Sequence, residues 1–369
     1  MSNKKSTAGA ITIALALILA ACGSDADKAA ETTAKAAATT AAPATTAAAA
    51  ATTAAATETT AATDGTTAGS TPAAEIPDLS AYTIGFAQVG AESGWRTANT
   101  KSIQSAAEDA GVKLVFTDAQ GKQEAQVESI RGFIEQKVDL IAFSPVVETG
   151  WDAVLGEAKE AGIPVILTDR AVDSKDTSLY KTFLGSDFVL EGEKAGDWVN
   201  TEFADADSVK IVELQGTTGS APALDRAEGF RNKVTDPKFD IIASQTGEFT
   251  REGGKKVMEA FLQANPEIDL VYAHNDDMGL GAIEAIEAAG LVPGEDIKIL
   301  TVDAVHDGMQ ALADGKINFI VECSPLLGPQ LMQLAGAVLN GETVPERVVT
   351  VETTFDQEQA IAALPDRQY

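Results

Sequence analysis

The chain has 369 residues, a formal net charge of −28 and a sequence pI of about 4.3. This acidity argues against binding to nucleic acid or to an anionic membrane surface, because both depend on basic patches. The chain is too long for one small core, and the part that follows residue 80 is long enough for two lobes.

The first 22 residues have the pattern of an export signal. Lys4 and Lys5 precede the apolar run Ile11–Ala20, which is shorter than the ~20 residues that a membrane-spanning helix needs. The run ends in Leu19–Cys22, which resembles a bacterial lipobox, and in lipoproteins of that kind the Cys is lipidated and becomes the new N-terminus. We therefore predict a signal peptide over 1–22 and lipidation of Cys22. The alternative is a plain secretory signal with a chance Cys.

The next segment has a composition that cannot form a core. Gly23–Thr71 is nearly all Ala and Thr and has no aromatic residue, so it buries too little apolar surface to offset its ordering entropy. We expect residues 23–80 to be a disordered tether that holds a folded domain off a membrane. A low-complexity tail without a task is the alternative.

Cysteine and histidine are scarce in the rest of the chain. Cys323 is the only cysteine beyond Cys22, so the mature domain has no intramolecular disulfide. His274 and His306 are far apart, and no metal-binding spacing occurs around them. We expect no metal and no cofactor.

From residue 81 onward, short β-branched runs alternate with segments of helical periodicity, and Gly often follows the helical segments. The predicted strands are Tyr82–Ala87, Lys113–Asp118, Leu140–Ser144, Val165–Asp169, Phe183–Ser186, Lys210–Leu214, Ile241–Thr246, Leu270–His274, Ile297–Val302 and Asn318–Val321. The predicted helices include Thr97–Ala110, Lys122–Lys137, Trp151–Ala161, Ala223–Val234, Gly253–Asn265, Gly279–Ala289 and Gly308–Ala313.

This alternation predicts the fold class. Continuous apolar strands separated by helices are typical of parallel sheets covered on both faces. The series begins twice in similar style, at Ile84–Gly90 and at Ile211–Gly216. We predict an α/β fold with two doubly wound, Rossmann-like lobes. In such sheets ligands bind outside the carboxyl ends of the strands, where polar and charged residues gather in this chain.

Several of these segments together carry a family resemblance. They are Gln88–Arg96, Pro145–Trp151, Glu213–Thr217 and Tyr272–Met278. The chain resembles the type I periplasmic sugar-binding proteins from about Tyr82 to about Val351, and is most similar to the galactofuranose-binding member of that group. The resemblance implies the substrate-binding component of an ABC importer, a monomer whose partners are permease subunits. The lipobox and tether depart from the soluble periplasmic form.

The resemblance also implies how the chain divides into lobes. Lobe 1 would comprise residues 81–185 plus 323–349, and lobe 2 would comprise 187–321 plus 350–369. A three-segment hinge would join the lobes near Gly185–Asp187, Val321–Cys323 and Val348–Val351. The protein would work outside the cytoplasm, either lipid-anchored to the outer face of the cell membrane through Cys22 or in a periplasm.

The residues at the strand ends suit a sugar, which offers adjacent hydroxyls and an apolar C–H face. Trp95 would stack on the C–H face, with its indole N–H free to donate. Arg96, Asp169 and Arg170 would act from lobe 1, and Arg226, Asn275 and Asp303 from lobe 2, with Glu322 at the hinge. The full candidate set is Glu92, Ser93, Gly94, Trp95, Arg96, Asp169, Arg170, Arg226, Asn275, Asp303 and Glu322.

The charges of this set point to the ligand class. Arg96, Arg170 and Arg226 are balanced by Asp169, Asp303 and Glu322, whereas a site for a phosphate or a sugar acid keeps excess positive charge. We therefore expect a neutral monosaccharide, with galactofuranose as the first choice. A binder of the same fold for ribose, another pentose or hexose, a quorum signal or a nucleoside is the alternative.

Two other classes of protein fit less well. A glycosidase needs two carboxylates beside one bond, and carboxylates are plentiful, but no nucleophile elbow, P-loop or metal motif occurs. A repressor with a two-lobed sensor needs a basic helix-turn-helix before the lobes, where this chain has a signal and a tether. We expect a binding protein rather than an enzyme.

Overall fold

The computed structural model of the protein describes residues 75–369. The predicted signal peptide, the lipidation site Cys22 and most of the predicted tether lie outside the described residues. Among the helices of this part of the chain, none combines the length and the apolar character needed to cross a membrane.

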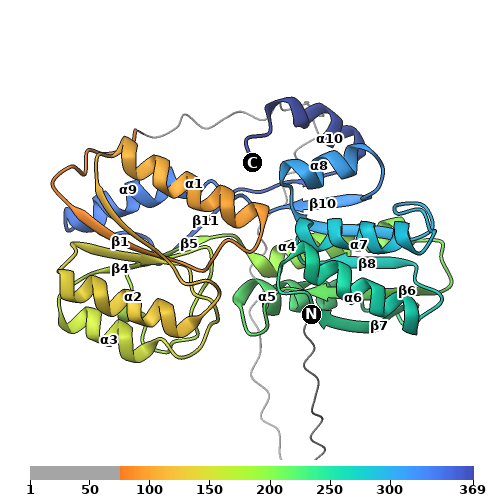
Figure 1. Ribbon diagram of the computed structural model, residues 1–369, viewed down its shortest axis with the longest axis horizontal. Helices are drawn as coiled ribbons and strands as arrows, with labels where there is room; N and C mark the ends of the chain where they lie inside the picture. Colours follow the sequence, from red (N-terminus) through yellow and green to blue (C-terminus); the bar gives the residue numbers. More distant parts are fainter. Residues whose placement is uncertain (1–74) are drawn as a thin grey trace, which may run out of the picture. The chain divides into compact units, whose positions relative to one another are not determined.

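The first lobe is built on a parallel sheet of six strands (Figure 1), with the order β11-β5-β4-β3-β1-β2. Its strands are β1 (Thr83–Gln88), β2 (Lys113–Asp118), β3 (Leu140–Phe143), β4 (Val165–Thr168), β5 (Thr182–Gly185) and β11 (Arg347–Val349). The central strands β3 and β4 are buried at every residue, which explains why their sequences are apolar without alternation.

Helices cover both faces of this sheet. The helices are α1 (Gly94–Asp109), α2 (Gln123–Gln136), α3 (Asp152–Glu160) and α9 (Gly328–Leu339), with a 3-10 turn at Thr177–Leu179. One apolar cluster joins Ile103 of α1 to Leu331 of α9, and a second joins Phe133 of α2 to Leu155 of α3. The lobe therefore has a core on each side of the sheet.

The second lobe repeats this plan with the order β12-β10-β9-β8-β6-β7. Its strands are β6 (Val209–Gln215), β7 (Phe239–Thr246), β8 (Leu270–Ala273), β9 (Lys298–Asp303), β10 (Phe319–Glu322) and β12 (Thr354–Phe355). All neighbouring strands are parallel except β12, which runs antiparallel to β10.

The helices of the second lobe also form two layers. They are α4 (Phe188–Glu202), α5 (Ala221–Lys233), α6 (Arg251–Ala264), α7 (Asp276–Ala288), α8 (His306–Ala313) and α10 (Gln357–Ala363), with a 3-10 turn at Leu364–Asp366. Phe230 of α5 packs in one cluster, and Met258 of α6 packs with Met278 of α7 in another. The expected fold class, two doubly wound α/β lobes, is confirmed.

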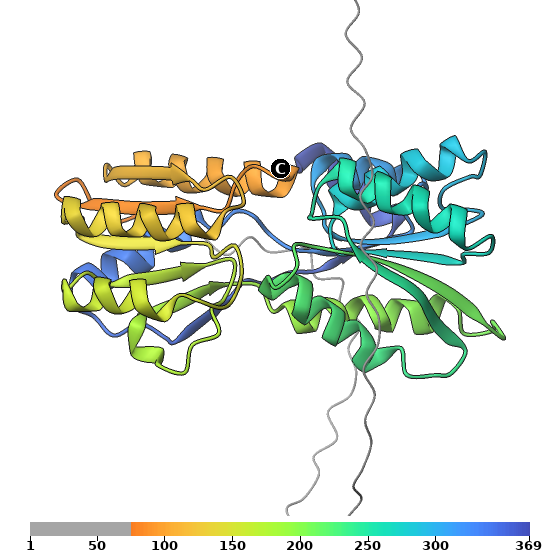
Figure 2. The same ribbon diagram turned by 60° about the horizontal axis from the view of Figure 1, so that its bottom comes forward.

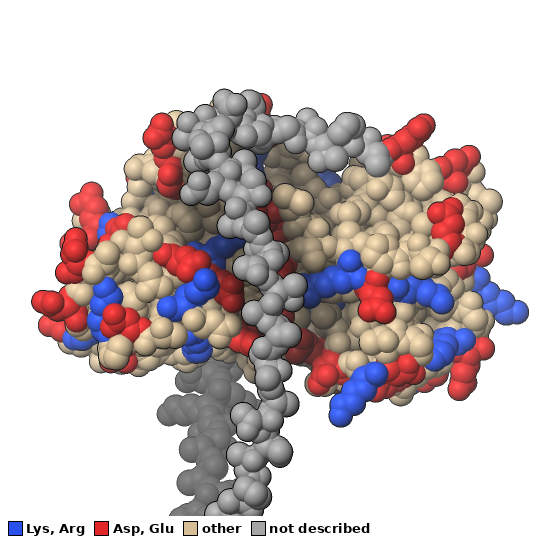
Figure 3. Space-filling model, turned by 180° about the vertical axis from the view of Figure 1, so that it is seen from behind, with Lys and Arg blue, Asp and Glu red and all other residues tan. Residues whose placement is uncertain are grey.

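The chain passes between the lobes three times (Figure 2). Strand β5 of the first sheet leads to α4 of the second lobe, β10 of the second sheet leads back to α9, and β11 leads to β12. Acidic and basic side chains are interspersed on both lobes on the face shown in Figure 3.

The ordered part of the first lobe begins before the point that the sequence suggested. The composition predicts a tether up to residue 80, yet Leu79 is buried and its N–H donates to the carbonyl of Ala110 at 2.8 Å. Ile76 packs against the same apolar cluster. Two large aliphatic residues are enough to attach the end of the predicted tether to the lobe.

Candidate functional site

The carboxyl ends of the two sheets enclose a cavity of about 290 Å³. Segments that follow β1 and β4 line it from the first lobe, and segments that follow β6, β7, β8 and β9 line it from the second. The lining residues are Glu92, Ser93, Trp95, Arg96, Asp169, Arg170, Pro222, Arg226, Phe249, Asn275, Asp303 and Cys323. This is the place where open parallel sheets bind ligands.

Two helix caps hold residues of the site in position. The Ser93 hydroxyl accepts from the backbone N–H of Arg96 at 3.1 Å and caps α1. The Asn275 side chain accepts from the N–H of Met278 at 3.0 Å and caps α7 in the same way. Ser and Asn are preferred at this position because their side chains satisfy free N–H groups of the first turn. Each cap therefore fixes where the first turn meets the cavity.

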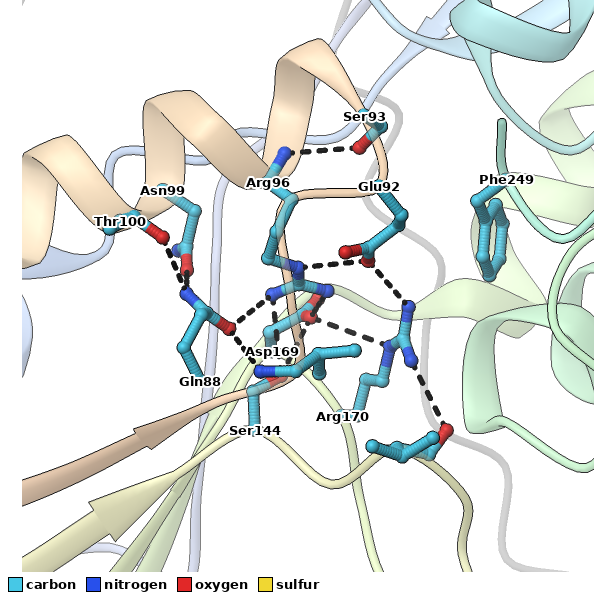
Figure 4. Close-up of polar contacts among 12 residues, drawn as sticks. Gln88, Glu92, Ser93, Arg96, Asn99, Thr100, Ser144, Asp169, Arg170 and Phe249 are labelled. Atoms are coloured by element: carbon cyan, nitrogen blue, oxygen red, sulfur yellow. Dashed lines mark hydrogen bonds and ion pairs between the residues drawn. The ribbon is translucent and has the colours of Figure 1, made fainter. Parts of the chain in front are cut away.

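Arg96 is the centre of the first-lobe half of the site (Figure 4). Its NH2 group lies 2.6 Å from Oδ2 of Asp169, and its Nε lies 3.1 Å from Oε1 of Glu92. Its NH1 group also donates to Gln88 at 3.3 Å and to Ser144 at 3.4 Å. The guanidinium is almost fully buried, so these partners leave it little freedom to move.

Arg170 completes this half. It donates from NH2 to Glu92 at 3.4 Å and from NH1 to the carbonyl of Val146 at 3.2 Å, whereas its buried Nε has no hydrogen-bond partner within the described part. Burial and the neighbouring Arg96 lower the pKa of Arg170 to about 10, although Glu92 and Asp169 act in the opposite direction. Burial would raise the pKa of Glu92, but the two guanidinium groups outweigh it and lower the pKa.

In the second lobe, Arg226 bridges the cavity and the core. Its Nε lies 2.7 Å from Oε2 of Glu191, and its NH1 donates to the carbonyl of His274 at 2.6 Å. Its NH2 lies 3.9 Å from Asp303. Burial opposes the charged form, but Glu191, Cys323 and Asp303 outweigh it and raise the pKa of Arg226.

Asp303 is the last residue of β9, and its carboxylate has fewer hydrogen-bond partners among the described residues than the other acids of the site. Within the described residues no group donates a hydrogen bond to its carboxylate, and Arg226 at 3.9 Å is its nearest cation. Burial raises its pKa well above the usual range, despite the opposing charge of Arg226. Its φ of 120° is a strained value for a residue other than Gly, of the kind that gathers at ligand sites. The geometry leaves this acceptor for a ligand.

Trp95 lines the cavity, but the structure corrects one expectation about it. Its indole N–H is not free, because it donates to the carbonyl of Cys323 at 2.7 Å. The ring packs in an apolar cluster of the second lobe with Phe188 and Val321, and the guanidinium of Arg96 lies 4.7 Å from its centre. Trp95 is therefore a contact between the lobes as well as a wall of the cavity.

Phe249 is a second aromatic wall, which the sequence analysis missed. It follows β7 and lies opposite Glu92 and Arg170 in Figure 4, with the Arg170 guanidinium 5.3 Å from its ring centre. A Cβ at Gly216 would lie 1.8 Å from this ring, so only Gly leaves room for it. Its place just after the carboxyl end of the predicted strand Ile241–Thr246 is the sequence signal by which it can be found.

Two of the candidate residues do not line the cavity. Gly94 instead donates its N–H to Asp277 of the second lobe at 2.7 Å. Glu322 lies 2.9 Å from Arg367 and accepts from the backbone N–H of Thr353 at 3.1 Å. Glu322 is the last residue of β10, and the next residue, Cys323, lines the cavity. Where the sequence predicts Glu322, the structure therefore places Cys323 at the cavity wall.

Contacts across the cavity show that the lobes are closed on each other. Besides the bond of Gly94 to Asp277, the N–H of Glu148 in the first lobe donates to the carbonyl of Gly219 in the second at 3.0 Å. The cavity is therefore enclosed from both sides.

Among the described residues, one group of side chains has the composition of a metal site. Glu191, Cys323 and Glu352 place ligand atoms within 4.8 Å of one another beside the lobe crossings. One carboxylate oxygen of Glu352 already accepts from Ser186 at 2.5 Å, Thr350 at 2.8 Å and the N–H of Ser324 at 2.9 Å. This cluster ties the crossings together through hydrogen bonds.

Two α/β lobes that close on a polar cavity at the carboxyl ends of their sheets have the architecture of the two-lobed, hinged binding proteins. Residues 84–343 match the family described as "Periplasmic binding protein domain", and the chain belongs to that family. The expectation of a binding protein that is not an enzyme agrees with this membership.

The relatives that the chain resembles bind sugars. It is 47% identical to the galactofuranose-binding protein YtfQ of Escherichia coli over 278 residues, which covers 74% of this chain and 87% of that protein. A solved structure from Mycobacterium smegmatis in complex with β-D-fucofuranose is 67% identical, with a TM-score of 0.77 and coverage of 78% and 95%. The arabinose transporter component of Shewanella, bound to L-arabinofuranose, is 46% identical with a TM-score of 0.75 and coverage of 78% and 95%.

Proposed function

We propose that the protein captures one neutral monosaccharide in furanose form, with galactofuranose as the first candidate, and delivers it to an ABC importer. The charge balance of the cavity carries this proposal. Three guanidinium groups line it together with the carboxyl groups of Glu92, Asp169 and Asp303, so basic and acidic groups are equal in number, with Glu92 in the place of Glu322. A site for an anion keeps excess positive charge.

The shape of the cavity supports a single sugar ring. Its empty volume of about 290 Å³, which includes space open to solvent, is below the range of roughly 300–1,000 Å³ for small-molecule sites, so it has room for a small ligand only. Trp95 and Phe249 offer ring faces to C–H groups, while Asp303 and the arginines offer acceptors and donors to hydroxyls. The similarity to proteins that bind fucofuranose, arabinofuranose and galactofuranose favours a five-membered ring.

Titration calorimetry tests the ligand class. Galactofuranose, arabinofuranose, galactopyranose, ribose and a sugar acid of matched size are each titrated into the protein. We expect the furanose forms to bind most tightly and the sugar acid not to compete with them. Tightest binding of the sugar acid, or of galactopyranose, would contradict the proposal. Arabinofuranose as the tightest ligand would instead favour the second candidate, a pentofuranose binder, which the similarity to the Shewanella protein supports.

We further propose that lipidated Cys22 anchors the protein outside the cytoplasm, which agrees with its periplasmic binding protein family. One acyl chain binds a membrane only marginally, so stable anchoring requires a multiply acylated Cys. The variant Cys22→Ser tests this in cells, by fractionation and by labelling with palmitate. We expect it to lose both the label and the membrane association. Retention in the membrane would refute the anchor while leaving the sugar proposal intact.

A further inference from the structure

A second and larger cavity lies next to the sugar cavity. It has a volume of about 970 Å³ and is lined from the first lobe by segments after β1, β2 and β3, and from the second lobe by segments after β6 and β7. Strands β2 and β7 are edge strands, and the crossings between the lobes lie toward the other edge of each sheet. This outer cavity is therefore on the side of the cleft away from the hinge.

Two segments separate the outer cavity from the sugar cavity. Glu92 lines both of them. Phe249 lines the sugar cavity, and its neighbours Glu248 and Thr250 line the outer one. A ligand that extends from one cavity into the other passes between Glu92 and the turn at residues 248–250.

The carboxylate of Glu92 has an unused acceptor at this boundary. Its Oε1 is held by Arg96 and Arg170, but its Oε2 is buried and has no hydrogen-bond partner within the described part of the chain. A Cβ built on Gly90, which lines the outer cavity, would lie 3.3 Å from that oxygen. A buried acceptor without a donor is unfavourable, and a sugar hydroxyl would satisfy it.

The opposite side of the boundary is a strained turn. Glu248 and Phe249 have φ values of 56° and 59°, so two consecutive residues other than Gly adopt the left-handed conformation. Side-chain hydrogen bonds hold the turn. The hydroxyl of Thr246 donates to Oε1 of Glu248 at 3.1 Å, and the side chain of Thr250 accepts from the N–H of Gly253 and caps α6. Strained conformations of this kind persist where the surrounding structure holds them, and they cluster at ligand clamps.

The lining of the outer cavity has the same mixed character as a sugar site. Asp118, Gln120 and Thr217 supply polar groups, while Ala91 and Val146 supply apolar surface. The Gln120 side chain makes no hydrogen bond to any of the described residues, so its donors and acceptor are open to a ligand. The outer cavity, at about 970 Å³, is larger than the inner cavity, at about 290 Å³, in which we place one sugar ring.

We propose that the outer cavity holds a second sugar unit, linked glycosidically to the monosaccharide in the inner cavity, and that furanosyl disaccharides belong to the substrate class. This inference rests on the proposed function, because it takes the inner cavity to hold a furanose. The polar groups of the outer cavity bind hydroxyls of the second ring, and its apolar surface contacts the C–H groups.

Calorimetry with galactofuranose and with a β-galactofuranosyl disaccharide tests the proposal in the wild type and two variants. Ala91→Trp places a large ring in the outer cavity from an exposed position outside the inner one. Ala288→Trp adds the same ring at an exposed position near the end of α7, at the opposite end of the strands, as the matched control. We expect the wild type to bind the disaccharide within tenfold of the monosaccharide. Ala91→Trp would lower disaccharide affinity at least tenfold and change monosaccharide affinity less than threefold.

The outcomes separate this inference from the function it rests on. Tight monosaccharide binding with disaccharide binding more than a hundredfold weaker would overturn the inference and leave the proposed function standing. An equal loss of both ligands in Ala91→Trp would overturn it as well, because the outer cavity would then not distinguish them. If neither furanose ligand binds the wild type, the proposed function itself fails.

Discussion

The two halves of the sugar site are built on different electrostatic plans. In the first lobe, Arg96 and Arg170 lie among Glu92 and Asp169, and each acid is within hydrogen-bond distance of a guanidinium. In the second lobe, Arg226 is held by Glu191, and Asp303 remains without a hydrogen bond from the described residues. The acids of the first half are paired within the protein, whereas the second half keeps a carboxyl group to which none of the described residues donates a hydrogen bond.

The pKa values of the buried acids show the same difference between the two halves of the site. The pKa of Glu92 is lowered, because two guanidinium groups outweigh its burial. In the second lobe burial dominates, and it raises the pKa of Glu191 to about 8 and that of Asp276 to about 7. Arg226 does not offset the burial of Glu191 and Asp303, and Arg367 does not offset that of Asp276.

The largest effect should come from breaking the first-lobe network. Arg96→Met leaves Glu92 and Asp169 buried without their main cation, which costs about 3–5 kcal/mol of unfolding free energy. Urea unfolding measures this loss, and calorimetry measures the accompanying loss of sugar binding. The control is Arg131→Met, whose ion pair with Glu157 is about half exposed and contributes less than about 1 kcal/mol. Equal stability of the two variants would show that the network is not needed for folding.

The second-lobe acceptor should affect binding without affecting folding. Asp303→Ala should remove a buried hydrogen-bond partner of the proposed ligand, a loss of about 1–3 kcal/mol or roughly 5- to 150-fold in affinity. Unfolding free energy should not fall, because within the described chain no group donates a hydrogen bond to this carboxylate. Calorimetry and urea unfolding test both parts, with the exposed Asp307→Asn as the control. Undiminished affinity would remove Asp303 from the site.

The buried acid Glu191 should make stability depend on pH. Its pKa rises from an ordinary value of 4.5 to about 8 on folding, because the folded protein holds the proton more tightly. Its contribution to the unfolding free energy is therefore full below about pH 4.5 and is lost as the pH rises to about 8. Within that window the unfolding free energy falls by about 1.4 kcal/mol per pH unit from this group alone. Cys323, Glu352 and Arg226 surround it.

Urea unfolding at pH 5, 6, 7 and 8 checks this expectation. The unfolding free energy of Glu191→Gln should fall less steeply with rising pH than that of the wild type. Asp197→Asn, an exposed substitution on the same helix α4, should follow the wild type. Parallel curves for Glu191→Gln and the wild type would mean that Glu191 is ionised throughout the range.

The smallest effect concerns the contact that joins the two halves. Trp95→Phe keeps an aromatic wall but removes the N–H that donates to Cys323 at the crossing that follows β10, a loss of about 1 kcal/mol. We expect a fewfold weaker affinity and a larger radius of gyration by X-ray scattering without ligand. Trp198→Phe in α4 of the second lobe, which packs on Phe319, is the control. An unchanged radius would show that this bond does not hold the lobes together.

Much of the site could be predicted because parallel sheets place ligands at a known edge. Arg96, Asp169, Arg170 and Asp303 directly follow or end apolar strands, so each could be found from local sequence. Phe249 also follows the end of a strand, β7, but the sequence prediction did not include it. The resemblance predicts Glu322 at the hinge, whereas the way the two lobes meet decides that Cys323 faces the cavity.

The sequence by itself determined the class of fold, since strand length, apolar content and helical periodicity are local properties of the chain. It also determined the balance of charges, because residue types do not change on folding. Only the tertiary structure decided that the Trp95 N–H donates to Cys323 and that Arg226 forms ion pairs with both Glu191 and Asp303. It also decided that a second cavity adjoins the first. These depend on how the two lobes meet, because they join residues that lie far apart along the chain.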